Sequence, residues 1–245
     1  MTDRLLRTAT RTHSFSESVI REMTRVAREH DAINLAQGFP DFPAPQLLKD
    51  AACAAIQGDV NQYAITWGTA NLRNALSEKY AAMYDLEFDP EREITVTCGA
   101  TEAMAAVMLA TIDPGEEVIV FEPFYENYGP DAVLSQASPV FLPLEAPDYR
   151  VERDRLEAVV TPKTRAIVVN TPNNPTGRVF DRDELQAIAD ICREYDILAI
   201  TDEIYEHIYY ESEHLVLAGF EGMRDRTITV SGLSKTFSVT DRKST

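Results

Sequence analysis

Apolar positions in the first third of the chain recur at helical spacing. In the segment 17–29, for example, Val19 and Met23 fall on the same face of a helix. The same period recurs in two later segments, 45–57 and 69–84. We therefore predict three helices over these ranges. The stretch INLAQGFPDFPAP between the first two contains prolines that exclude a continuous helix there.

From about residue 93 the pattern changes, because short apolar runs begin to alternate with helical stretches. The runs lack the polar alternation of a sheet with one solvated face, which favours strands covered on both faces. Strands are predicted within ITVTC, EEVIVFEP, PVFLPLE, RAIVVNTP, ILAITDE and TITVSG. A helix expected at 182–195 has a start signal, since Asp181 precedes it and Glu184 stands three residues later. Alternating strands and helices predict an α/β fold with a mostly parallel sheet and flanking helices.

Chemically active side chains follow the predicted strands. Ligands of open parallel sheets bind at the carboxyl ends of the strands. The loops expected there contain CGAT at 98–101, EPFY at 122–125, NTPNNPTG at 170–177, TDEIY at 201–205 and SGLSK at 231–235. One edge of the sheet should therefore gather a helix-start glycine, an aromatic ring, an amide, a carboxylate, a phenol and a lysine.

Several common sites do not fit these loops. GLSKT is similar to the end of a P-loop, but Ser234 and Thr229 occupy the positions of its two required glycines. The sequence contains no G-x-G-x-x-G and no G-x-S-x-G, which excludes the nicotinamide fingerprint and the hydrolase elbow. The acidic and histidine side chains of DEIYEH lack the E-x-x-H and H-E-x-x-H spacings, so no metal site is predicted.

The net charge of the chain limits the classes of partner that it could bind. Its 245 residues include 40 acidic and 23 basic side chains, a formal net charge of −17. This charge repels nucleic-acid phosphates and anionic lipids, so we expect neither a nucleic-acid nor a membrane partner. The N-terminal sequence lacks the apolar core of a secretory signal. Cys53, Cys98 and Cys192 are odd in number and widely spaced, which predicts reduced, buried thiols and a cytoplasmic protein.

The motifs, taken together, resemble the class I and II aminotransferases of fold type I, within them the branch with kynurenine, glutamine and methionine aminotransferases. The resembling segments are LAQGFPDF, NQYAITWG, TCGATEA, EPFYENY, NTPNNPTG, TDEIYEH and SGLSKTFSVT. PNNPTG, DEIY and SGLSK are specific as an ordered set, although each alone is a weak signal. The resemblance implies pyridoxal 5′-phosphate as cofactor. It also implies amino-group transfer from an aromatic, methionine, glutamine or kynurenine-type α-amino acid to a 2-oxo acid.

The same resemblance assigns the central chemistry to four residues. Lys235 would attach to the cofactor aldehyde and move the substrate α-proton, which needs a dry or cationic setting. Asp202 would keep the pyridine nitrogen protonated. Tyr205 and Asn174 would donate hydrogen bonds to the 3′-oxygen of the ring, and Asn174 would also contact the substrate. The alternatives are a solvated lysine, a capping or exposed aspartate, and an asparagine that serves only as a turn residue.

Other residues are implied to hold the cofactor phosphate. Gly99, Ala100 and Thr101 would open a helix whose free N–H groups suit a phosphate dianion, although any strand-to-helix turn uses similar residues. Ser231 and Ser234 are candidate phosphate hydroxyls.

The resemblance also implies contacts with the ring, the substrate and a second subunit. Tyr125 would stack on the cofactor ring and line the substrate site, where Gly38 would contact the substrate carboxylate; a core aromatic is the alternative for Tyr125. Tyr63 would reach the phosphate of a neighbouring subunit, which implies a homodimer.

The resemblance stops near the C-terminus. The family continues into a Gly-Trp-Arg sequence, a last antiparallel strand and a smaller domain, whereas this chain reads DRKST at 241–245. We therefore expect an N-terminal arm over 1–45, an incomplete cofactor-binding large domain over 46–240 and a non-matching tail over 241–245, with impaired turnover. A cysteine-S-conjugate β-lyase with the same cofactor and a non-catalytic interaction protein remain alternatives.

Overall fold

The computed structural model describes residues 7–13, 15, 18–38, 40 and 42–240, and the predicted tail at 241–245 lies outside them. The chain divides into two compact units, Met1–Pro43 and Ala44–Thr245. The first unit contains the short turn η2 (Thr10–Thr12) and the helix α1 (Val19–Glu29). The second unit contains the other elements and the candidate site.

Two predicted helices of the second unit form as expected, α2 (Gln46–Gln57) and α3 (Ala70–Tyr84). The helix α3 is fastened at its start by Arg73, whose side chain is fully buried. The Arg73 guanidinium donates hydrogen bonds to the Gly68 and Pro90 carbonyl oxygens and pairs with Glu91. These bonds tie the first turn of α3 to the segments on either side of it.

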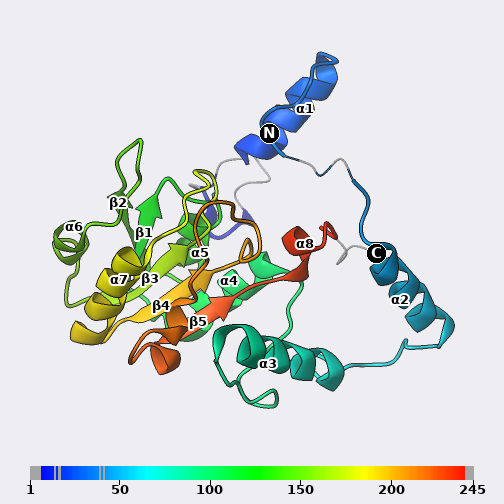
Figure 1. The fold of residues 1–245 in the computed structure, drawn as a ribbon. Helices are drawn as coiled ribbons and strands as arrows, with labels where there is room; N and C mark the ends of the chain where they lie inside the picture. Colours follow the sequence, from blue (N-terminus) through cyan, green and yellow to red (C-terminus); the bar gives the residue numbers. More distant parts are fainter. Residues whose placement is uncertain (1–6, 14, 16–17, 39, 41, 241–245) are drawn as a thin grey trace. The chain divides into compact units, whose positions relative to one another are not determined.

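A five-stranded sheet forms the centre of the second unit (Figure 1). Its strands are β1 (Glu117–Glu122), β2 (Ser138–Pro143), β3 (Thr164–Asn170), β4 (Leu198–Asp202) and β5 (Thr227–Val230). They lie in the order β2-β1-β3-β4-β5, and all four pairings are parallel. The predicted α/β fold with a parallel sheet is therefore confirmed. The register pairs Asn170 with Asp202 and Asp202 with Val230, so these three strands end at one edge.

Helices pack on both faces of the sheet (Figure 1). One face contacts α4 (Ala100–Thr111) and α5 (Tyr128–Leu134), and the other contacts α6 (Arg153–Glu157) and α7 (Arg182–Glu194). Successive side chains of β1 point to opposite faces, with Val120 toward α4 and α5 and Phe121 toward α6 and α7. Because both faces are buried, the strand sequences lack a polar alternation.

The start of α7 forms the predicted capping box. The Asp181 carboxylate accepts hydrogen bonds from the backbone N–H groups of Asp183 and Glu184. In return, the Glu184 carboxylate accepts one from the Asp181 N–H, at 2.9 Å. Each carboxylate thereby satisfies backbone donors that the first turn of a helix leaves unpaired.

The strand predicted within ITVTC does not form. Residues 94–97 have no regular secondary structure and lie outside the described sheet, and the Val96 N–H donates to the Trp67 carbonyl oxygen at 3.0 Å. A strand requires a neighbouring strand that pairs with its N–H and C=O groups. The described sheet ends at β5, with no partner for this segment. Apolar β-prone residues were therefore insufficient to form a strand here.

Among the described residues, we find no helix whose length and apolar character would let it cross a membrane.

Candidate active site

The carboxyl edge of the sheet brings together most of the residues predicted for the site. Asp202 ends β4, Asn174 lies in the loop after β3, and Tyr125 lies in the loop after β1. Lys235 lies in the short helix α8 (Leu233–Thr236), directly after β5. Parallel strands that end at one edge place the loops that follow them side by side, which explains why these four positions converge.

Asp202 is a buried carboxylate, with only 5% of its surface exposed. Its Oδ2 accepts a hydrogen bond from the Tyr128 hydroxyl at 2.6 Å, and its Oδ1 accepts one from the Ile204 N–H at 3.3 Å. Burial raises the pKa of Asp202, and this effect outweighs the opposing effects of the two hydrogen bonds and the Lys235 charge. A carboxylate that is costly to ionise alone is suited to a cationic ligand, which would recover the lost solvation.

Tyr205 lies between Asn174 and Lys235. Its phenol lines the same pocket as the Asn174 side chain, and the Lys235 Nζ lies 5.8 Å from the centroid of its ring. Burial, followed by the negative charge of Asp202, raises the pKa of Tyr205, so the phenol keeps its proton at neutral pH. Lys235 itself is exposed. The dry setting expected for this amine is therefore not formed by the described residues.

The start of α4 forms as predicted, with Gly99 as the residue before the first helical position. Gly99 has a φ of 85°, which favours glycine, and a Cβ at this position would meet nothing within 4 Å. The space next to the helix start is therefore open. Ala100 and Thr101 begin the helix, and Thr101 lies near the Tyr125 phenol. The ring of Tyr125 packs edge-on against Tyr128, with centroids 5.9 Å apart.

The two serines near Lys235 have different surroundings. The Ser231 hydroxyl donates a hydrogen bond to Glu206 Oε1 at 2.5 Å, so it is already engaged within the protein. Ser234 is half-buried in α8. Between them, the backbone of Gly232 passes very close to Ile204, since a Cβ at position 232 would lie 2.7 Å from Ile204 Cδ1. A side chain at position 232 would therefore require the Ile204 side chain to shift.

The two remaining predicted residues are Tyr63 and Gly38. Tyr63 lies in the loop between α2 and α3, and its side chain is fully exposed. Gly38 belongs to the unit Met1–Pro43. Their predicted contacts, with the phosphate of a second subunit and with the substrate, stay predictions.

Sequence reasoning missed Asn170, which connects two parts of the site. Its amide nitrogen donates to the Asp202 carbonyl oxygen at 2.8 Å, and its Oδ1 accepts from the Asn174 N–H at 2.8 Å. Asn170 is buried at the end of β3. A polar residue that ends an otherwise apolar buried strand was the available signal, because such groups are nearly always hydrogen-bonded. Tyr128 was also missed, although it stands within the EPFYENY motif.

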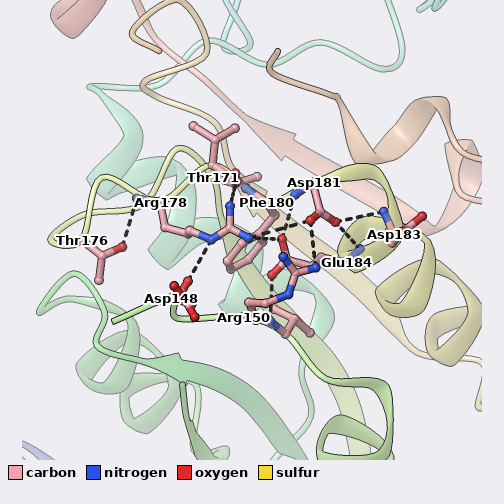
Figure 2. A network of polar contacts seen from close by, with 11 residues as sticks. Asp148, Arg150, Thr171, Thr176, Arg178, Phe180, Asp181, Asp183 and Glu184 are labelled. Atoms are coloured by element: carbon pink, nitrogen blue, oxygen red, sulfur yellow. Dashed lines mark hydrogen bonds and ion pairs between the residues drawn. The ribbon is translucent and has the colours of Figure 1, made fainter. Parts of the chain in front are cut away.

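A network of charged groups anchors the loop that carries Asn174 (Figure 2). Arg178, at the end of this loop, donates to Glu184 Oε2 at 2.5 Å and to the Asp148 carbonyl oxygen at 3.0 Å. Glu184 is 2% exposed and also accepts from the Val151 N–H at 2.9 Å. The loop is therefore fixed to β4 by Asn170 at one end and to the start of α7 by Arg178 at the other.

Comparison with known proteins identifies relatives of the chain. The family model Aminotransferase class I and II matches residues 30–242. A probable N-succinyldiaminopimelate aminotransferase of Mycobacterium tuberculosis is 44% identical over 240 residues, which are 96% of this chain and 60% of that protein. Kynurenine–oxoglutarate transaminase 3 of Homo sapiens is 41% identical, over 96% of this chain and 54% of that protein. The solved structure of the N-succinyldiaminopimelate aminotransferase from Mycobacterium tuberculosis matches with a TM-score of 0.90 and 43% identity, over 94% of this chain and 61% of that chain.

The parallel sheet and its flanking helices define an α/β fold of the fold type I transferases. More specifically, the chain belongs to the class I and II aminotransferases, a family whose members use pyridoxal 5′-phosphate. The chain spans between 54% and 60% of the length of these two curated relatives.

Proposed function

We propose that this chain forms the cofactor-binding part of a pyridoxal-phosphate-dependent aminotransferase. The observation that carries the proposal is the convergence of Asp202, the Tyr205–Asn174 pair and the Lys235 amine at one sheet edge. This donor set fits the cofactor, which needs an anion at its ring nitrogen, hydrogen-bond donors at its ring oxygen and an amine for its aldehyde.

Each of these residues would contact a different part of the cofactor. Asp202 holds a proton on the ring nitrogen, and its own ionised form is supported by the Tyr128 hydroxyl and the Ile204 N–H. Tyr205 and Asn174 bind the ring oxygen. Lys235 holds the cofactor through its amine and then moves the proton at the substrate α-carbon. When bound, the cofactor supplies an electron-withdrawing ring that takes up the negative charge developing at that carbon.

The phosphate would bind at the start of α4, through the N–H groups that follow Gly99. The 12-residue helix presents free N–H groups and the positive end of its dipole there, and the space next to Gly99 is open. Ser234 stays a candidate hydroxyl for the same phosphate. Tyr125 would stack on the ring and line the substrate side of the site.

We further propose that the substrates are a 2-oxo acid and an α-amino acid of the aromatic, methionine, glutamine or kynurenine type. The human relative named for kynurenine transamination supports this choice. We propose a homodimer as the working unit, which the full exposure of Tyr63 supports. Cys192 is buried as expected, whereas Cys53 and Cys98 are exposed, so the predicted burial was wrong for these two. That all three are free supports a cytoplasmic location, where thiols stay reduced.

The proposal is tested by cofactor attachment in the 245-residue chain. We expect added pyridoxal 5′-phosphate to give a visible absorption band, and borohydride reduction to fix the cofactor on the peptide that contains Lys235. Lys235→Ala should abolish the band and the label. Lys163→Ala is the matched control, because Lys163 is exposed just before β3, at the amino edge of the sheet. A band that survives in Lys235→Ala, or a label on another lysine, would refute the proposal.

A further inference from the structure

A buried polar cluster lies beside the segment that carries Lys235. Its centre is Glu206, with 2% of its surface exposed. The Glu206 carboxylate accepts hydrogen bonds from the Lys79 Nζ at 2.5 Å, the Tyr84 hydroxyl at 2.7 Å and the Ser231 hydroxyl at 2.5 Å. Lys79 and Tyr84 belong to α3, whereas Ser231 follows β5. One carboxylate therefore joins two elements that are far apart in the sequence.

The residues Ser231–Lys235, here called the lysine segment, meet the turn 203–206 next to this cluster. The Glu203 N–H donates to the carbonyl oxygen of Val230, just before the segment, at 2.8 Å. The backbone of Gly232 lies against the Ile204 side chain, whose Cδ1 would be 2.7 Å from a Cβ at this position. Together with the bond from Ser231 to Glu206, these contacts hold the start of the lysine segment against the turn that carries Tyr205.

The far end of the lysine segment is held much less firmly. The helix α8 has four residues, and a helix of this length has little stability of its own. Its apolar side chain Leu233 is 47% exposed, and Phe237 just beyond it is 39% exposed. The position of Lys235 therefore depends on how the start of the segment is anchored.

The charges in the cluster favour a strong anchor. The side chain of Lys79 is 24% exposed and pairs with the nearly fully buried Glu206. Burial would raise the pKa of Glu206, but the hydrogen bonds from Lys79, Ser231 and Tyr84 outweigh it and lower that pKa. Glu206 therefore stays ionised at neutral pH. Hydrogen bonds to an ionised acceptor are about twice as strong as neutral ones.

We propose that Glu206 is a positioning residue for Lys235, acting through the Ser231 hydroxyl. By holding Ser231 it fixes the lysine segment against the Tyr205 turn, so that the Lys235 amine stays next to the Tyr205 ring. This inference rests on the proposed function, since that function gives Lys235 its task. It assigns Ser231 to the anchoring of the lysine segment, in place of the phosphate contact expected from the sequence.

The test compares two variants that each remove one hydroxyl from Glu206. Ser231→Ala breaks the link to the lysine segment, whereas Tyr84→Phe removes a bond on the α3 side only. We expect Ser231→Ala to lower the fraction of borohydride-fixed cofactor on Lys235 by about tenfold at subsaturating cofactor, the lower end for one hydrogen bond to a charged group. Tyr84→Phe should stay within about twofold of the unaltered chain, and Ser231→Thr, which keeps the hydroxyl, should restore labelling.

Pyridoxal, which lacks the phosphate, separates anchoring from phosphate binding. An anchoring role predicts the same loss with pyridoxal in Ser231→Ala, whereas a phosphate contact predicts no loss. Hydrogen exchange without cofactor is a further readout, in which the amides of 232–237 should exchange faster in Ser231→Ala but not in Tyr84→Phe. Equal effects of the two variants, or none from Ser231→Ala, would overturn the inference and leave the proposed function standing. Failure of the unaltered chain to label at Lys235 would instead overturn the proposed function. Hydrogen exchange would then still show whether Ser231 anchors the lysine segment.

Discussion

The hydroxyl of Tyr128 gives a direct measure of how the sheet edge stabilises a buried acid. It donates to Asp202 Oδ2 at 2.6 Å, and Tyr128 is 1% exposed, so Tyr128→Phe removes one hydroxyl and keeps the ring. Burial and then the Asp202 charge raise the pKa of Tyr128, so its phenol keeps the donating proton throughout the accessible pH range. The substitution therefore removes one defined hydrogen bond.

The size of the effect depends on the charge of Asp202. Because burial raises the pKa of Asp202, the ionised carboxylate costs folding free energy, and stability falls as the pH rises from the unfolded to the folded pKa. The bond from Tyr128 offsets part of this cost. Its loss should lower the unfolding free energy by about 1.5–3 kcal/mol where Asp202 is ionised, and by about 1 kcal/mol where it is protonated.

Urea unfolding at the lowest and the highest pH at which the chain stays folded measures this difference, with the larger loss expected at the higher pH. Tyr195→Phe is the matched control, because the Tyr195 hydroxyl donates to Glu157 at 2.8 Å while Tyr195 is 40% exposed. It should cost less than about 1 kcal/mol at both pH values, since its partners remain solvated. An equal loss for Tyr128→Phe at the two pH values, or one as small as the control, would refute the reasoning.

Three other outcomes are expected. Glu184→Ala removes one acceptor of Arg178 and the acceptor of the Val151 N–H, and should cost about 3 kcal/mol in urea unfolding. Glu157→Ala, whose side chain is 39% exposed, should cost less than about 1 kcal/mol, and equal costs would contradict the network in Figure 2. Asn170→Ala should weaken cofactor binding about tenfold in an equilibrium titration, because it removes the bonds to Asn174 and Asp202. Asn173→Ala leaves these two bonds intact and should change the binding little. Similar losses in the two variants would argue against a bridging role for Asn170. Burial raises the pKa of Asp131 from 3.8 to about 6, so the stability of the fold should fall as the pH rises through that interval. In thermal unfolding, Asp131→Asn should remove this fall. If the dependence of stability on pH is unchanged in Asp131→Asn, another group causes it.

Much of the fold follows from local properties of the sequence. The helical period of apolar residues located α2 and α3, because the period reports which face of a helix is buried. Continuous apolar runs located five of the six expected strands, because strands covered on both faces need no polar alternation. The capping box at Asp181 and Glu184 was predictable for a similar reason, since its partners are three residues apart. The convergence of Asn174, Asp202 and Lys235 was predictable from strand order, because parallel strands deliver their loops to one edge.

Contacts between distant residues were decided only by the tertiary structure. ITVTC has the composition of a strand but no partner in the described sheet, and a ladder needs a second strand. The bond from Tyr128 to Asp202 joins residues 74 positions apart, and that from Lys79 to Glu206 joins residues 127 apart. Composition and spacing determined which chemical groups this protein brings to the sheet edge. Their hydrogen-bond partners and pKa shifts depended on which groups folding removes from water together, a property that no local pattern records.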